Sequence, residues 1–185
     1  MEYSPEITMF LCANCARTGK EPTSAGRNRP IVPEFNLPGR VEQIVVPCTG
    51  RLQPEHILRA FEAGSKLVSV VACQDDNCHY AEGSRRCALR IDYIRSILSE
   101  IGLGDGRLLL FHLPGSASED MAKASGSTAC PVASDGLDDQ IASVRTRMVE
   151  ALQAHPPNPL GRFVSKPSPV DFDEDLALNE GGGDE

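Results

Sequence analysis

The segment Lys66–Gly83, KLVSVVACQDDNCHYAEG, joins a buried type of β-strand to a pair of cysteines. Its strand, Leu67–Ala72, is apolar at five of six positions, which is typical of a parallel strand covered on both faces. Cys73 follows the strand directly, and Cys78 comes after four more residues. The segment therefore predicts a central strand with thiols at its carboxyl end.

Two other strand-like segments end in the same way. Ile7–Leu11 leads into Cys12, with Cys15 three residues further on, and Val41–Val46 leads into Pro47 and Cys48. Five thiols thus follow three predicted strands. Because the carboxyl ends of parallel strands meet at one edge of a sheet, we expect these thiols to gather there.

The other elements alternate with these strands. A helix begins at Pro54 and ends near Gly64, and a second has apolar residues at intervals of four and three and ends at Gly102. A fourth strand covers Arg107–Leu113, and a last amphipathic helix covers Leu137–Ala154. Between the first two strands, the Gly- and Pro-rich stretch from Cys15 to Arg40 predicts a long loop with room for one helical turn after Cys15.

This order predicts an α/β fold. We expect one three-layer domain over residues 5–155, with a mostly parallel four-stranded sheet in a flavodoxin-like arrangement. Residues 156–185 are Pro-rich and then acidic, and we expect them to form a disordered tail.

Composition narrows the function. The chain has 185 residues and a formal net charge of −8, which argues against nucleic acid as its partner. It shows no membrane-crossing apolar run and no signal-type leader, so we expect a cytoplasmic protein. Seven cysteines in such a protein favour metal binding or redox chemistry over disulfides.

Several chemistries suit the clustered thiols. An iron–sulfur cluster needs four converging thiolates, and Cys12-x2-Cys15 and Cys73-x4-Cys78 provide two close pairs, with Cys48 as a fifth candidate. A structural zinc site uses similar pairs, so spacing does not separate the two. A Cys-x-x-Cys dithiol oxidoreductase acting through Cys12 and Cys15 is a third reading, and simple packing of buried cysteines is a fourth.

Other residues have weaker signals. Cys87 falls on the apolar stripe of its helix and is predicted to pack in the core, whereas Cys130 precedes a proline in a loop and is predicted to be a free thiol. His79 follows Cys78. We interpret it as an ordinary loop histidine or as a proton-coupled neighbour of the site, in preference to a metal ligand. Three arginines lie near the thiols, namely Arg51, Arg85 and Arg86. We expect them to offset the negative charge of a thiolate site, to contact an acidic partner, or to be solvated surface residues.

Three motifs together resemble a known family. FLCANC at 10–15, VPCTGRLQPEHILRAFEAG at 46–64 and VVACQDDNCHYAEG at 70–83 are similar to the delta, or iron–sulfur, subunit of methyl-viologen-reducing hydrogenases. The resemblance covers about residues 7–113. Ala13-Asn14 replaces the aromatic that the family usually has between the first two cysteines, and no candidate ligand is missing.

This resemblance implies a function. Members hold a 2Fe-2S cluster and relay electrons between a hydrogenase, or a formate dehydrogenase, and a heterodisulfide-reductase-like flavoprotein. The chain would then be one component of an oxidoreductase complex with no substrate site of its own. The family's five cysteines match Cys12, Cys15, Cys48, Cys73 and Cys78, one more than a cluster needs.

Overall fold

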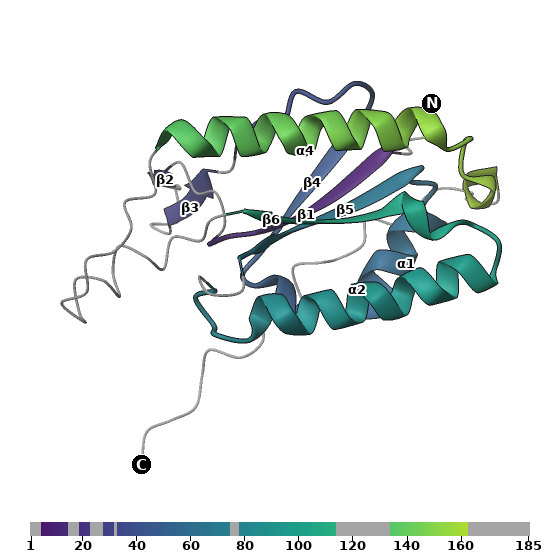
Figure 1. The fold of residues 1–185 in the computed structure, drawn as a ribbon, viewed down its shortest axis with the longest axis horizontal. Coiled ribbons are helices and arrows are strands. Elements are labelled where there is room, and N and C mark those ends of the chain that lie inside the picture. Colours follow the sequence, from purple (N-terminus) through teal and green to yellow (C-terminus); the bar gives the residue numbers. More distant parts are fainter. Residues whose placement is uncertain are drawn as a thin grey trace, which may run out of the picture.

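The computed structural model describes residues 5–14, 19–22, 28–31, 33–74, 78–113 and 134–162. Four parallel strands form its main sheet in the order β4-β1-β5-β6 (Figure 1). They are β1 (Ile7–Cys12), β4 (Val41–Val46), β5 (Leu67–Cys73) and β6 (Leu108–Leu113). The predicted α/β class, the parallel sheet and its flavodoxin-like order are confirmed.

Helices cover both faces of the sheet. Figure 1 shows α4 (Ser134–Ala154) on one face, and α1 (Pro54–Glu62) and α2 (Gly83–Glu100) on the other. The chain crosses from β4 to β5 through α1 and from β5 to β6 through α2, moving in the same direction both times. When two right-handed crossovers run in the same direction across a sheet, their helices lie on the same face, as observed here.

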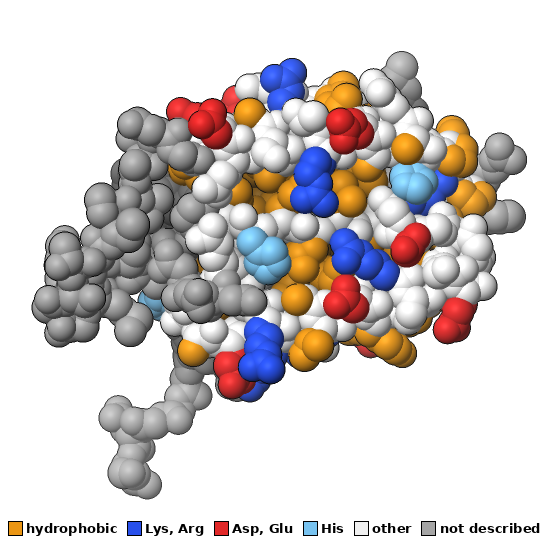
Figure 2. All heavy atoms as spheres, in the orientation of Figure 1, with side chains coloured by type: hydrophobic (Ala, Val, Ile, Leu, Met, Phe, Trp, Pro, Cys, Tyr) orange, Lys and Arg blue, Asp and Glu red, His pale blue; other side chains and the backbone are white. Residues whose placement is uncertain are grey.

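Each helical layer has its own half of the core. Phe10, Val68 and Val70 pack with the α2 residues Ile91 and Ile94. The alternate strand residues turn to the other face, where Met9, Leu11 and Val71 cluster with Val144 and Met148 of α4. At the edge strand β6, Leu109 and Leu110 are half-buried, and Figure 2 shows hydrophobic side chains at the surface between the α4 and α2 layers. The sheet is therefore a central layer packed on both faces.

Short helical turns complete the elements. They are η1 (Thr49–Arg51) after β4, η3 (Asp105–Arg107) before β6 and η4 (Pro159–Arg162) after α4. No helix within the described residues is both long and apolar enough to cross a membrane.

The long predicted loop contains an unpredicted hairpin-like pair. Strands β2 (Gly19–Pro22) and β3 (Asn28–Ile31) pair in antiparallel fashion. Each has four residues and includes a proline, so neither has the apolar alternation by which a strand is recognised. The helical turn expected after Cys15 lies outside the described residues.

Ordered structure continues beyond the predicted boundary at residue 155. Asn158, which is 7% exposed, donates through Nδ2 to the carbonyls of Phe61 (2.7 Å) and Ser65 (2.8 Å). Leu160 packs against the α1–α2 half of the core. Asn158 and Leu160 therefore contact the predicted domain, although composition placed them in the tail. The rest of the predicted disordered tail, residues 163–185, lies outside the described residues.

Candidate metal centre

The parallel register brings two cysteines to the ends of neighbouring strands. Cys12 is the last residue of β1 and Cys73 the last residue of β5, and these strands pair directly. Because β1 borders β4 on one side and β5 on the other, this is the point where strand order reverses. Ligand sites of doubly wound sheets lie at such points.

Cys12 and Cys73 form a close pair of thiols. Their Sγ atoms are 3.6 Å apart, and both side chains are almost fully buried. Cys78 packs against this pair. The structure therefore brings these three predicted site residues together at the carboxyl edge of the sheet.

Cys48 and Cys78 form a second pair, around Gly83 at the first turn of α2. A Cβ atom on Gly83 would lie 2.5 Å from the Cys48 sulfur and 3.2 Å from the Cys78 sulfur. A Cβ atom on Gly50 would come within 2.7 Å of the Gly83 Cα atom, so the two glycine backbones are in close contact. Two glycines thus make the space in which these sulfurs approach each other.

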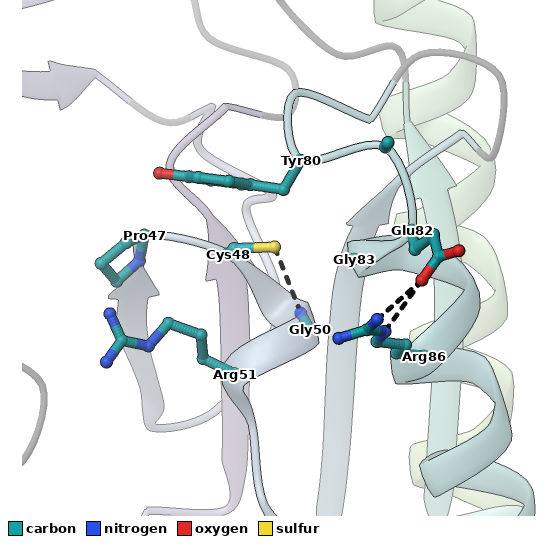
Figure 3. Close-up of a pocket in the computed structure, with 9 residues that line it drawn as sticks. Pro47, Cys48, Gly50, Arg51, Tyr80, Glu82, Gly83 and Arg86 are labelled. Atoms are coloured by element: carbon teal, nitrogen blue, oxygen red, sulfur yellow. Dashed lines mark hydrogen bonds and ion pairs between the residues drawn. The ribbon is translucent and has the colours of Figure 1, made fainter.

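The surroundings of Cys48 disfavour the charged thiolate form of its side chain. Burial raises the pKa of the Cys48 thiol, and the neighbouring thiols Cys12 and Cys78 raise it further. The backbone N–H of Gly50 opposes this effect because it donates to the Cys48 sulfur at 3.4 Å (Figure 3). Without a cation the Cys48 sulfur would therefore keep its proton, whereas a bound metal would replace that proton and stabilise the thiolate.

The other cysteines differ in their placement. Cys87 lies in the hydrophobic core, as predicted, and burial raises its pKa to about 11. Cys15 and Cys130 lie outside the described residues, so the structure describes four of the five predicted ligands. Among the described residues, no three His, Cys, Asp or Glu side chains are grouped so as to hold a single metal ion.

Hydrogen bonds fix the backbone that carries the thiols. Arg90 of α2 donates through Nη1 to the carbonyls of Gly50 and Leu52, the latter at 3.1 Å, which ties the segment after Cys48 to α2. The Cys73 carbonyl accepts from Ser84 Oγ and from His112 Nδ1 (3.0 Å). The sequence did not predict these residues. Each bonds a carbonyl that is distant in sequence, and no regular spacing of residue types indicates such a bond.

A pocket of about 460 Å³ opens at the surface beside Cys48. In Figure 3 the Tyr80 ring lies over the Cys48 side chain, with Arg51 and Arg86 on either side of the opening. Tyr80 is 56% exposed and has the ring of His79 edge-on at 4.9 Å. The thiol pocket thus reaches the surface through an aromatic and basic rim.

Comparisons with known proteins agree with this geometry. Residues 7–131 match the family model described as "Methyl-viologen-reducing hydrogenase, delta subunit". The chain is 32% identical over 115 residues to the iron-sulfur subunit of the F420-non-reducing hydrogenase of Archaeoglobus profundus, covering 62% of this chain and 79% of that one. It is also 32% identical over 120 residues to the vhu iron-sulfur subunit of the F420-non-reducing hydrogenase of Methanococcus maripaludis, covering 65% of this chain and 84% of that one.

A second kind of relative is much longer. The chain is 32% identical over 104 residues to one subunit of the ferredoxin:CoB-CoM heterodisulfide reductase of Methanosarcina mazei. The match covers 56% of this chain but 12% of that protein. A segment similar to this chain is therefore one part of a larger polypeptide there.

Proposed function

Since this chain belongs to the family of methyl-viologen-reducing hydrogenase delta subunits, we propose that it is an electron-transfer subunit holding one 2Fe-2S cluster. The proposed ligands are Cys12, Cys48, Cys73 and Cys78. When bound, the cluster supplies one-electron redox chemistry, and the chain has no substrate site of its own. The protein would connect a hydrogenase, or a formate dehydrogenase, to a heterodisulfide-reductase-like flavoprotein.

The observation that carries this proposal is the arrangement of thiols as two close pairs in contact. Cys12 and Cys73 form one pair, Cys48 and Cys78 flank Gly83 as the other, and Cys78 packs against the first pair. A 2Fe-2S cluster takes two thiolates at each of its two irons. A zinc ion instead needs all four thiolates around one point. The pairing therefore favours the binuclear cluster.

The surrounding residues set the properties of the site. The Gly50 N–H that donates to the Cys48 sulfur would stabilise negative charge and so raise the tendency to accept an electron. Burial of Cys12 and Cys73 excludes water from one side of the site, while the Tyr80 rim keeps the other side near the surface. An electron carrier needs both a protected cluster and a short route out.

The relatives support two of the proposed kinds of partner, a hydrogenase and a heterodisulfide reductase. Two relatives of which the match covers most of the length are named as hydrogenase iron-sulfur subunits, and in Methanosarcina mazei the similar segment lies within a heterodisulfide reductase polypeptide. Joining two modules in one chain raises their effective concentration, as expected when both act in one electron path. We place the protein in the cytoplasm, where thiols are kept reduced for cluster assembly.

Anaerobic purification of the full chain tests the cofactor. We expect about two irons and two sulfides per chain, and visible absorption that bleaches with dithionite. A colourless protein with one zinc would instead establish a zinc-stabilised interaction module. A metal-free protein with a redox-active cysteine pair would establish a dithiol oxidoreductase.

A further inference from the structure

Exposed hydrophobic side chains concentrate around one helix. Among the residues whose exposure the structure describes, four large hydrophobic side chains are exposed, namely Tyr80 (56%), Leu89 (67%), Tyr93 (60%) and Ile101 (59%). All four lie on α2 or close to its ends. Such a concentration on one element marks an interaction surface more than scattered exposed residues do.

The exposed side chains extend from the rim of the thiol pocket along α2. Tyr80 and Arg86 line the pocket beside Cys48. Arg86, Leu89 and Tyr93 follow one another at intervals of three and four residues, so they form one stripe along the exposed side of α2. Arg85 adjoins this stripe, four residues before Leu89. We call the surface made by Tyr80, Arg85, Arg86, Leu89 and Tyr93 the α2 face.

The α2 face has a local charge opposite to that of the whole chain. The chain carries a net charge of −8, whereas Arg51, Arg85 and Arg86 are all exposed at the pocket end of this face. Glu82 pairs with Arg86 at 2.7 Å and offsets one of these charges. The pocket end therefore remains basic, which suits a partner with an acidic surface and disfavours a second copy of this acidic chain.

We propose that the α2 face is the surface on which the heterodisulfide-reductase-like flavoprotein docks through an acidic patch. Tyrosine and arginine are among the side chains most enriched at the energetic centres of protein interfaces. The stripe would place the partner beside Tyr80, where the thiol pocket opens, so docking and electron exit share one site. This inference rests on the proposed function, because it assigns a partner to the same metal centre.

Binding measurements on the cluster-loaded full chain test the proposal. The probe is the heterodisulfide-reductase-like flavoprotein of the organism that encodes the chain, and the readout is the dissociation constant as a function of salt. Arg85→Glu with Arg86→Glu should weaken binding at least tenfold and flatten its salt dependence. Leu89→Asp should weaken binding to a similar degree, and iron content and absorption should stay unchanged in both variants.

Two matched variants serve as controls. Arg145→Glu makes the same kind of charge reversal on an exposed residue of α4, and Ile101→Asp makes the same apolar-to-acidic change at the far end of α2. Both should bind like the wild type. Wild-type affinity in the Leu89→Asp and arginine variants would overturn the α2 face while leaving the proposed partner intact. No binding by a cluster-loaded wild type would overturn the proposed partner and the α2 face with it.

Two further measurements test other occupants of the α2 face, namely a second copy of the chain and the chain's own acidic terminus. If sedimentation shows that the wild type self-associates and Leu89→Asp is monomeric, the face is a contact between copies and the proposal is wrong. If removing residues 163–185 abolishes the effect of the arginine variants, the chain's own acidic terminus is the occupant, which also overturns it.

Discussion

The two ends of the sheet are built from different chemistry. At the amino-terminal end, polar side chains bond one another or backbone carbonyls: Thr8 with Ser65 (2.7 Å), Arg107 with the Leu103 (2.8 Å) and Lys66 (3.1 Å) carbonyls, and Asn158 with the Phe61 and Ser65 carbonyls. At the carboxyl-terminal end, sulfurs contact sulfurs around two glycines. Hydrogen bonds therefore hold the amino-terminal end together, whereas the carboxyl-terminal end gathers the thiols that we propose as cluster ligands.

The largest expected effect is at the thiol end. Cys73→Ser replaces one sulfur of the 3.6 Å pair with an oxygen that binds iron poorly, so we expect near-complete loss of iron and of visible absorption. Cys48→Ser should act in the same way. Circular dichroism should show that the fold remains, because the strands do not depend on these sulfurs.

The two cysteines outside the described residues, which are not among the four proposed ligands, provide the controls for that experiment. Cys15→Ser and Cys130→Ser should keep the cluster, because neither belongs to the four proposed ligands. Loss of iron in Cys15→Ser with retention in Cys48→Ser would show that the proposed ligand set is wrong.

Gly83→Ala should separate cluster binding from folding. The added methyl would meet the Cys48 sulfur at 2.5 Å, and that sulfur is the end of a side chain that can rotate away. Alanine favours a helix interior over glycine by about 1 kcal/mol, and part of that preference applies at Gly83, the first residue of α2. We therefore expect most of the iron to be lost while the free energy of unfolding of the metal-free protein stays the same or rises.

Gly102→Ala is the opposite case, at the other end of α2. Nothing lies within 4 Å of its added methyl, but its φ of +74° is costly for alanine. We expect a loss of about 1 kcal/mol in the free energy of unfolding and full iron content. Equal iron loss in both glycine variants would mean that the close approach at Gly83 has no special role.

Arg107→Met should damage the amino-terminal end without touching the metal centre. Arg107 is 3% exposed, and removal of its guanidinium leaves the carbonyls of Leu103 and Lys66 without these donors. A loss of about 3 kcal/mol in the free energy of unfolding is expected from urea titration. Arg95→Met is a milder control, because its side chain is 33% exposed. Iron loss in Arg107→Met under native conditions would show that the two ends are coupled.

The two ends also differ in how far the sequence predicts them. The thiol end is predictable because each of Cys12, Cys48 and Cys73 follows a recognisable apolar strand, and parallel strands bring their ends together. The amino-terminal end is not, since Arg107 bonds the distant carbonyl of Lys66 and Asn158 bonds carbonyls more than 90 residues away, and nothing in the sequence spacing indicates such bonds. Asn158 lies between prolines, so composition alone assigns residues 156–162 to the tail.

Asn158→Ala tests this unpredicted anchor. Its amide donates to two carbonyls from a buried position, so its loss should lower the free energy of unfolding by about 2 kcal/mol. The nearby exposed residue Gln153 offers a control, as Gln153→Ala should change stability by less than about 0.5 kcal/mol. If both variants unfold alike, the anchor does not stabilise the domain.

The shorter of two truncations has the smallest expected effect, and its comparison with the longer one tests where the domain ends. Removing residues 163–185 takes away all the acidic side chains of the C-terminal stretch but none of the described contacts, so the free energy of unfolding should change by less than about 0.5 kcal/mol and iron content should not change. Removing residues 156–185 also deletes Asn158 and the packing of Leu160, and should cost more than Asn158→Ala. The difference between the two truncations measures what residues 156–162 contribute to the amino-terminal end. If the shorter deletion were as damaging as the longer one, the boundary of the domain would lie beyond residue 162, and the closed end of the sheet would include part of the acidic terminus.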